Sequence, residues 1–264
     1  MNKSVEIVVT DKLLASGGAV KRVKRADQIV EAVKRWVVVS NLQPGERLPN
    51  EKALMELFDC AKGTVREALK SLEVQGLVSI KTGPNGGAVL VQVPYALASQ
   101  MLRNYLHFQH PTGPDIYELR DLVEPEIARL VVDKLSADDL NELERLTNVC
   151  APIADSMEQR LEQRIAELDF HSLLAERCGN PLLGFIGRFL NDLLKDLVIF
   201  KKVHLPEQRE FSKSNLHYHQ ELVNALRAQD AVAVERLMRE HMQCAHKFNL
   251  ELEAQLSKQL LVST

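Results

Sequence analysis

The chain has 264 residues and a formal net charge of −3, and 45% of its residues are hydrophobic while 26% are charged. The length allows two domains of ordinary size, and the composition excludes an intrinsically disordered chain. No apolar run approaches the roughly 20 residues that cross a bilayer, and neither a secretory signal nor a CxxC pair is evident, so we predict a cytoplasmic protein with reduced cysteines and no membrane partner.

The charges are distributed unevenly along the chain. Residues 1–93 contain 14 Lys and Arg against 10 Asp and Glu, whereas the remainder contains 19 against 26. A basic N-terminal part joined to an acidic C-terminal part is typical of a nucleic-acid-binding module attached to a module that stays off DNA. The alternative is chance, because an excess of four charges alone does not exclude it.

Two segments open the chain. Residues 1–25 are predicted to form an N-terminal arm. Its basic cluster, residues 21–25, is either a solvated surface or a contact for DNA phosphates. Apolar residues at helical spacing then predict a helix over residues 27–40, which Pro44 and Gly45 terminate.

The next elements predict a winged helix-turn-helix domain over residues 26–93. Asn50 is a good N-cap for a second helix, and a third helix begins near Lys62 and closes at Gly76. Two short helices joined by a tight turn fit the DNA major groove, and a hairpin after them can reach the phosphate backbone. The two strands of this hairpin are predicted over residues 77–81 and 88–93.

The rest of the chain is predicted to be entirely helical. Residues 94–114 have helical spacing and are expected to form a packed linker helix. Residues 115–255 predict an antiparallel all-α bundle of about six helices, followed by a tail at residues 256–264. Within the bundle, Ser136-Ala137-Asp138-Asp139 is a helix start signal, and Asp230 is well placed as the N-cap of the last helix. The predicted fold class is therefore mainly α, with three helices and a β-hairpin wing at the N-terminus. In the first bundle helix, the spacing assigns to the buried face Ile116, Leu119, Leu122, Val123, Glu126, Ile127, Leu130 and Val131.

Four residues of the C-terminal part could surround a metal ion. Glu167 and His171 are four residues apart and therefore lie on one face of a helix. His219 and His241 lie on two later predicted helices. One carboxylate and three imidazoles suit a first-row transition metal and leave positions open for water or a ligand. The alternative is that these histidines are surface residues or hydrogen-bonded core residues.

Both parts of the chain resemble one known family. The N-terminal domain of GntR-type bacterial transcription regulators is similar to residues 26–93, which contain Leu42-x-Pro44-Gly45-x-x-Leu48-Pro49-x-Glu51 and Thr64-Val65-Arg66-Glu67-Ala68-Leu69-x-x-Leu72-x-x-x-Gly76-Leu77-Val78. The C-terminal part resembles the FCD sensor domain of the FadR branch of that family. The similar residues are Arg120-x-x-x-Glu124, Phe170-His171, Gly179-Asn180-Pro181-Leu182, His219-x-x-Leu222-x-x-Ala225-Leu226, Asp230 and Met238-x-x-His241-Met242.

The resemblance implies a DNA-binding surface in the N-terminal domain. Family members commonly touch DNA at the positions occupied here by Lys52, Lys62, Thr64 and Arg66 and at glycines of the wing. The family usually has Ser or Thr where this chain has Ala61, Arg where it has Lys62, and a bulkier polar residue where it has Gly63. Ala61 forfeits a helix cap of about 1 kcal/mol, and Lys62 cannot make the bidentate contact that Arg makes with guanine. The candidate DNA-binding residues are Arg47, Lys52, Lys62, Gly63, Thr64, Arg66, Lys81 and Gly86.

The resemblance also implies a metal and an effector. Metal-containing members use three histidines at these positions and an acid, usually Asp, four residues before the first. Here the acid is Glu167, and the implied cofactor is one divalent transition metal, zinc or nickel, held by Glu167, His171, His219 and His241. In such domains the metal and a nearby Arg anchor a small carboxylate, and Arg120 is the candidate because guanidinium pairs with carboxylate bidentately. Its alternative role is a salt bridge with Glu124 or Asp121.

These patterns predict a homodimeric regulator that binds double-stranded operator DNA and is not an enzyme. We expect a repressor whose operator affinity responds to a small carboxylate bound at the metal site. One alternative is a regulator of the same class that senses a bulky acyl ligand without metal, since some relatives bind acyl-CoA. Another is a helical metalloenzyme with a DNA-binding head, although the sequence offers no second Glu-x-x-His pair and no obvious general base.

Overall fold

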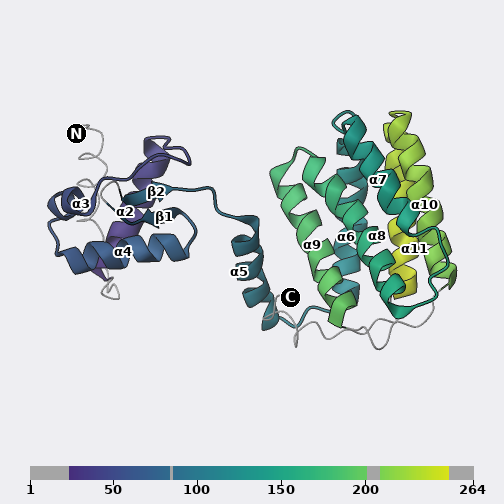
Figure 1. Ribbon diagram of the computed structural model, residues 1–264, viewed down its shortest axis with the longest axis horizontal. Helices are drawn as coiled ribbons and strands as arrows, with labels where there is room; N and C mark the ends of the chain where they lie inside the picture. The colour runs from purple at the N-terminus through teal and green to yellow at the C-terminus, as the bar shows by residue number, and fades with distance from the viewer. Residues whose placement is uncertain (1–23, 84–85, 201–208, 250–264) are drawn as a thin grey trace. The chain divides into compact units, whose positions relative to one another are not determined.

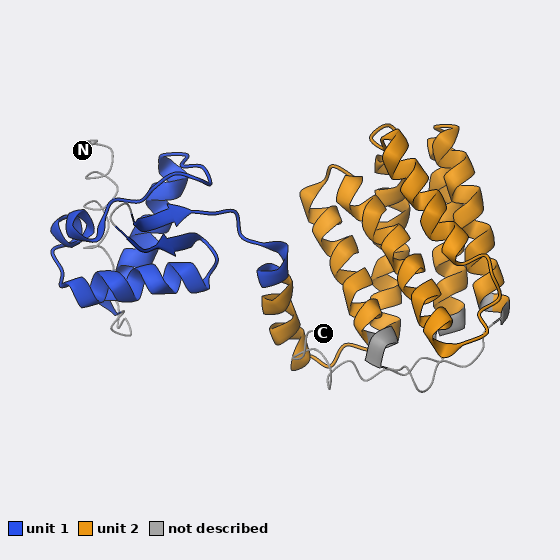
Figure 2. Ribbon diagram, viewed as in Figure 1, with its two compact units in different colours: residues 1–98 blue, residues 99–264 orange. Residues whose placement is uncertain are grey.

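The computed structural model describes residues 24–83, 86–200 and 209–249, in which the chain forms ten helices and a two-stranded antiparallel hairpin (Figure 1). The predicted fold class, mainly α with an N-terminal hairpin, is confirmed. The chain divides into two compact units, residues 1–98 and residues 99–264 (Figure 2). Most of the predicted arm and all of the predicted tail lie outside the described residues. Within them, no helix is both long and apolar enough to cross a membrane.

The first unit contains three helices followed by the hairpin, in the predicted order. Its apolar core is built around Ile29, Leu54, Val65 and Leu72, which are almost fully buried. Val78 pairs with Leu90 at one end of the hairpin. The elements are α2 (Arg25–Val39), α3 (Glu51–Phe58), α4 (Lys62–Val74), β1 (Val78–Lys81) and β2 (Gly87–Leu90).

The helix ends of this unit follow local chemistry. The Asn50 side chain accepts a hydrogen bond of 2.9 Å from the backbone N–H of Ala53 and so caps α3 as predicted. Ala61 occupies the N-cap position of α4 and supplies no side-chain acceptor. Gly76 follows α4 with a φ of +73°, and a Cβ there would lie 2.5 Å from the Leu97 side chain. Glycine is therefore required at this position.

The second unit is a bundle of long helices. Helices α6 and α11, α8 and α9, and α10 and α11 pack side by side, as Figure 1 shows. A linker helix precedes them, and its Arg103 forms a buried ion pair with Asp196 and lies 5.8 Å from the ring of Phe189. Helix α5 (Tyr95–His107) contains the boundary between the units, and the helices that lie within the second unit are α6 (Gly113–Leu130), α7 (Ala137–Val149), α8 (Met157–Arg177), α9 (Pro181–Phe200), α10 (Arg209–Arg227) and α11 (Ala231–Asn249).

Capping boxes set the starts of several bundle helices. Ser136 and Asp139 exchange hydrogen bonds at the start of α7, where the sequence predicts a helix start. Thr112 with Asp115 and Ser156 with Gln159 do the same for α6 and α8. Asp230 accepts a 3.0 Å hydrogen bond from the backbone N–H of Ala233 and caps α11 as predicted.

The predicted buried face of α6 is wrong in part. Leu119 and Leu122 are exposed, Leu122 to 71%, and Glu126 pairs with Arg129 at the surface. The helix instead buries Arg120 and Glu124 along with its apolar residues. Apolar periodicity assumes that a helix buries its most hydrophobic stripe, and this helix buries an ion pair four residues apart. The bundle interior next to α6 is therefore polar.

Candidate metal and effector site

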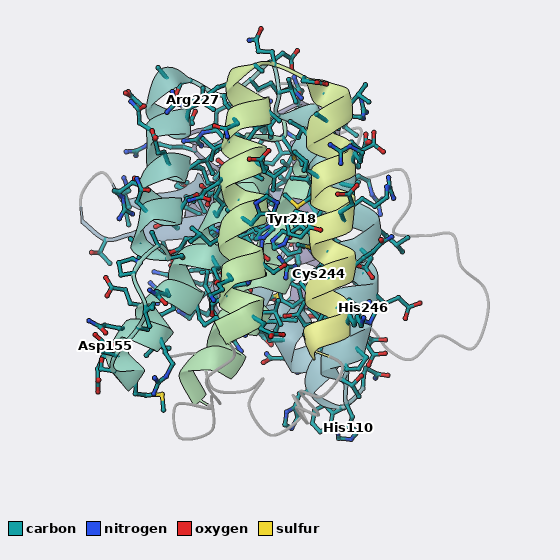
Figure 3. All side chains as sticks on the ribbon, turned by 90° about the vertical axis from the view of Figure 1, so that its right-hand side faces the viewer. His110, Asp155, Tyr218, Arg227, Cys244 and His246 are labelled. Carbon is teal, nitrogen blue, oxygen red and sulfur yellow. The ribbon has the colours of Figure 1, made fainter. Side chains whose placement is uncertain are left out.

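Three histidines from three helices meet inside the bundle. His171 of α8, His219 of α10 and His241 of α11 are each no more than 2% exposed. Their Nε2 atoms are 3.3 Å apart for His171–His219, 3.3 Å for His171–His241 and 3.1 Å for His219–His241. Figure 3 shows the level of the cluster, since its labelled Tyr218 on α10 lies 5.4 Å, ring to ring, from His241. The sequence-predicted histidines thus come together.

The geometry of the cluster fits a metal ion. A neutral imidazole nitrogen either carries a proton or offers a lone pair. Three nitrogens in mutual contact therefore cannot all be matched as donor and acceptor, and at least one contact joins two like groups. Two imidazole nitrogens bound to one zinc ion at about 2.0–2.1 Å are about 3.3 Å apart in tetrahedral geometry. A cation between three lone pairs removes the mismatch at the observed spacing.

Burial keeps these imidazoles neutral. Loss of hydration lowers the pKa of His171 and places the pKa values of His219 and His241 well below the ordinary value. The other imidazoles and Arg120 add to the lowering for His219 and His241. A metal binds the unprotonated nitrogen, so this environment preserves the ligand form. The Nδ1 atoms of His219 and His241 are buried without a partner among the described residues.

Glu124 orients the first of these histidines. Its Oε2 lies 3.1 Å from Nδ1 of His171, which donates and so directs the Nε2 lone pair toward the other imidazoles. Burial raises the pKa of Glu124, but His171 and Arg120 outweigh that effect and its pKa is lowered. We assign an ionised Glu124 and a neutral His171, because the Arg120 guanidinium already supplies the countercharge.

Arg120 is buried with part of its guanidinium unsatisfied. Its Nε donates to Glu124 Oε1 over 3.2 Å, the salt bridge weighed as an alternative from the sequence. Its Nη2, however, is buried without a hydrogen-bond partner among the described residues. The guanidinium also lies 5.6 Å from the ring of Tyr117. One donor edge of this cation is therefore available to a ligand.

Glu167 occupies a different position from the imidazole cluster. Its carboxylate accepts a 2.8 Å hydrogen bond from Arg164 and is buried on the same helix as His171. The metal-type donor atoms that lie within 4.8 Å of one another, among the described residues, are those of the three histidines. Glu167 is one turn from His171, so ligation by it requires its side chain to leave Arg164.

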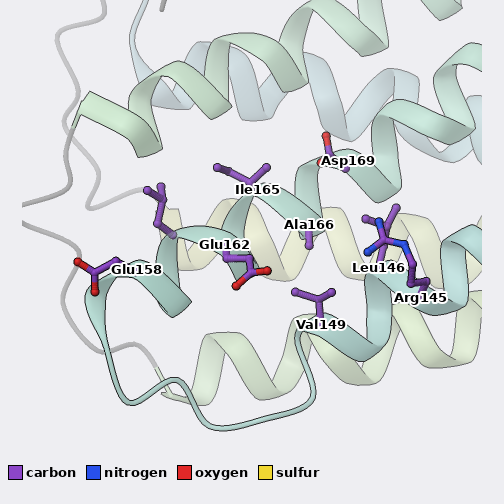
Figure 4. Close-up of a pocket in the computed structure, with 9 residues that line it drawn as sticks. Arg145, Leu146, Val149, Glu158, Glu162, Ile165, Ala166 and Asp169 are labelled. Atoms are coloured by element: carbon purple, nitrogen blue, oxygen red, sulfur yellow. The ribbon is translucent and has the colours of Figure 1, made fainter.

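A surface pocket of about 390 Å³ lies between α7 and α8 (Figure 4). Its walls include Arg145, Glu162 and Asp169. Arg145 is paired with Glu142 and Asp169 with Lys195. Asp169 is two residues from His171 and therefore on the opposite side of α8. The pocket is separate from the histidine cluster.

Most of the candidate DNA-binding residues are exposed on the first unit, and Thr64 and Gly86 are half-buried. Glu51 at the start of α3 pairs with Arg66 over 2.9 Å and with Lys62 over 3.5 Å, which holds both cations beside the N-terminal turn of α4. The same contacts, led by the hydrogen bond from Arg66, lower the pKa of Glu51. Lys52 is highly exposed and lies 4.0 Å from Glu56. Arg47 lies opposite Val89 of the wing in an isolated bridge.

The small residues of this surface have different reasons to be small. A Cβ on Gly63 would meet nothing within 4 Å, so packing within the chain does not require glycine there. A Cβ on Gly86 would lie 2.4 Å from the carbonyl oxygen of Lys81, so the turn of the wing does require it. Thr64 is half-buried, and Lys81 is exposed at the end of β1. Gly63 therefore leaves the backbone of α4 open to a partner.

The contact between Glu124 and His171 was not predicted from the sequence. The Arg120–Glu124 spacing of four residues was visible, but nothing in the sequence pairs Glu124 with a histidine 47 positions later. Such a contact becomes visible only when α6 and α8 are packed together.

Comparisons with known proteins bear on both units. The family described as bacterial regulatory proteins, gntR family, matches residues 25–86, and the FCD domain matches residues 115–243. The HTH-type transcriptional repressor NanR of Cronobacter sakazakii is 27% identical over 231 residues, which cover 84% of each chain. The putative HTH-type transcriptional regulator RmpR of Mycobacterium gastri is 31% identical over 162 residues, covering 61% of this chain and 58% of that one. The solved structure of Streptococcus agalactiae GntR matches with a TM-score of 0.54 and 24% identity, over 84% of this chain and 99% of that chain, which shows the shared fold.

Proposed function

The chain belongs to the GntR family of bacterial regulatory proteins, with an FCD domain, and we propose that this transcriptional regulator is a repressor whose affinity for operator DNA is controlled by a small carboxylate bound at a metal centre. Both matched families are those of transcription regulators and not of enzymes. The observation that carries the metal centre is the convergence of three buried Nε2 atoms at 3.1–3.3 Å. The spacing is that of imidazoles sharing one first-row ion.

We assign His171, His219 and His241 as metal ligands and Glu167 as the fourth. Glu167, one turn from His171 on α8, would reach such an ion only if its carboxylate left Arg164. Zinc and nickel are the favoured ions, because imidazole and carboxylate suit both. When bound, such an ion would supply a Lewis-acidic position for an oxygen of the effector, and the Nη2 of Arg120, which lacks a partner among the described residues, would donate to the carboxylate of the effector.

We further propose how the chain is divided and assembled. Residues 26–93 bind operator DNA, residues 94–114 link the domains, residues 115–255 bind the effector, and residues 1–25 and 256–264 are arm and tail. The protein acts as a cytoplasmic homodimer on a pseudo-palindromic site. Exposed apolar side chains of the second unit, such as Leu122 and Phe108, supply surface that a dimer would bury.

Regulation follows from differential binding. The carboxylate shifts operator affinity only if it binds the DNA-bound and free arrangements unequally, and a difference of a few kcal/mol suffices. The DNA contacts are assigned to Arg47, Lys52, Lys62, Gly63, Thr64, Arg66, Lys81 and Gly86. The residues of α4 contact base edges, and the other residues contact the phosphate backbone of the DNA and so position the protein on the duplex.

Elemental analysis tests the metal centre. Wild-type protein is expected to contain close to one equivalent of zinc or nickel, and the His219→Ala, His241→Ala double variant almost none. The matched control is His217→Ala, which removes a neighbouring imidazole that lies two residues from His219. Absence of metal from the wild type after zinc and nickel are offered would exclude the centre and leave the DNA-binding function standing.

A further inference from the structure

The helix α9 carries a buried amide that the metal centre does not use. Asn191 is 0% exposed, and neither its Oδ1 nor its Nδ2 has a hydrogen-bond partner among the described residues. Buried polar groups are almost always paired, and leaving one unpaired destabilises the folded state. An amide with both ends unpaired therefore needs an explanation.

The packing of α9 locates this amide. A Cβ on Gly187 would lie 2.6 Å from Ile127 Cδ1 of α6 and 3.1 Å from Ala175 Cβ of α8, so this face of α9 touches both helices. Asn191 follows Gly187 by one turn and lies on the same face. Lys195, one further turn along, reaches Asp169 and Ser172 of α8, so α9 runs antiparallel to α8.

The register brings Asn191 to the level of the effector site. His171 precedes Ala175 by one turn on α8, and Glu124 precedes Ile127 by about one turn on α6. Helix α9 also runs antiparallel to α6, since Gly187 meets Ile127 whereas Ile116 and Tyr117, earlier on α6, cluster with Leu193 and Leu194, later on α9. One turn beyond Gly187 along α9 therefore leads to the level of His171 and Glu124, on the face of α9 that packs against α6 and α8. Arg120 lies one turn from Glu124, about 6 Å along the axis of α6.

We infer that Asn191 is a specificity-determining contact for the effector and that it recognises an uncharged hydroxyl or carboxamide group. The inference rests on the proposed carboxylate site and identifies its ligand more closely. Arg120 Nη2 has no partner among the described residues and can donate to a carboxylate, and the Asn191 amide offers an NH2 donor group and a carbonyl acceptor side by side. A hydroxyl satisfies both amide atoms, whereas a second carboxylate can only accept and faces the Oδ1 lone pairs. The effector class is a small carboxylate that carries a hydroxyl or carboxamide.

The test compares acids that differ by one hydroxyl. Binding of lactate and propionate, and of malate and succinate, is measured by calorimetry on zinc-loaded full-length protein. The wild type is expected to prefer the hydroxy acid of at least one pair, and Asn191→Leu is expected to reduce that preference by about tenfold or more. Asn191→Ala serves as a second variant that leaves space in the seam, and Asn148→Leu on the exposed face of α7 is the control.

Thermal unfolding provides an independent readout. Replacing an unpaired buried amide by an apolar side chain of similar size removes its desolvation penalty, so ligand-free Asn191→Leu is expected to melt at or above the wild-type temperature. An undiminished hydroxyl preference in both Asn191 variants would show that the metal reads the hydroxyl, and would overturn the assignment of Asn191 alone. Binding of no acid in either pair, or equal binding by Arg120→Met, would overturn the carboxylate site and this inference with it.

Discussion

In the histidine cluster, the Nε2 atoms of His171, His219 and His241 contact one another, and their lone pairs repel unless a cation lies between them. His219 stacks on Phe170 with 4.2 Å between ring centroids, and His171 is held by Glu124, so neither ring can turn away without losing a packed contact. Protonation of these buried imidazoles is unfavourable, and so is the approach of their unprotonated Nε2 atoms to one another. Both effects favour an ion over a proton as the species at its centre.

The stability of metal-free protein is expected to fall on acidification. The three imidazoles have lowered pKa values in the folded state, whereas in the unfolded chain each titrates near about 6.5. Above that pH both states are neutral and nothing is lost. Below it the unfolded state binds more protons, so each histidine reduces the free energy of unfolding by up to about 1.4 kcal/mol per pH unit.

Urea unfolding of chelator-treated protein between pH 5 and pH 8 measures this slope. The His241→Gln variant removes one titrating group. Below pH 6.5 it is expected to reduce the slope of the free energy of unfolding against pH by up to the contribution of one bound proton, about 1.4 kcal/mol per pH unit. His217→Gln is the control. A slope equal to that of the wild type would show that His241 is not kept neutral by burial.

At the scale of the elements, helix ends and helix faces follow different rules. The cap of α4 is a local matter: Ala61 has extended backbone torsions suited to an N-cap but no side-chain acceptor for the first turn. The buried face of α6 is a tertiary matter, because its Arg120 and Glu124 are tolerated inside only through each other and His171.

Restoring the missing cap is expected to stabilise the first unit. Ala61→Ser supplies an acceptor for an N-terminal N–H of α4 and is predicted to add about 1 kcal/mol. Trp36 of α2 is the single tryptophan of the chain and packs against the core of this unit, so its fluorescence reports unfolding there. Ala61→Val, which offers no acceptor, is the control, and an equal gain in both variants would rule out capping as the cause.

At the scale of the whole molecule, basic residues predominate in residues 1–93 and acidic residues predominate in the remainder of the chain. The basic residues at the start of α4 are exposed, while the Arg120–Glu124 ion pair of the second unit is buried beside His171. Phosphate contacts supply most of the affinity of such a protein for DNA and make it salt-dependent.

Removal of one cation from α4 is expected to weaken operator binding. Arg66→Ala is predicted to cost about 1–3 kcal/mol of binding free energy, because a guanidinium at a base or phosphate contact is lost. Fluorescence anisotropy with operator DNA at several salt concentrations measures the loss and the change in salt dependence. Arg145→Ala in the second unit is the control, and an Arg66→Ala affinity equal to that of the control would remove Arg66 from the DNA-binding surface.

The sequence by itself determined the elements and their order. Asn50, Ser136 and Asp230 cap helices where predicted, because capping depends on residues three positions apart. It also singled out His171, His219 and His241, since helical periodicity turns each toward an interior. Only the tertiary structure decided that their Nε2 atoms meet within 3.3 Å, that Glu124 holds His171, and that Asn191 is buried unpaired. These facts depend on the rotation and register of helices far apart in sequence, and periodicity does not encode either.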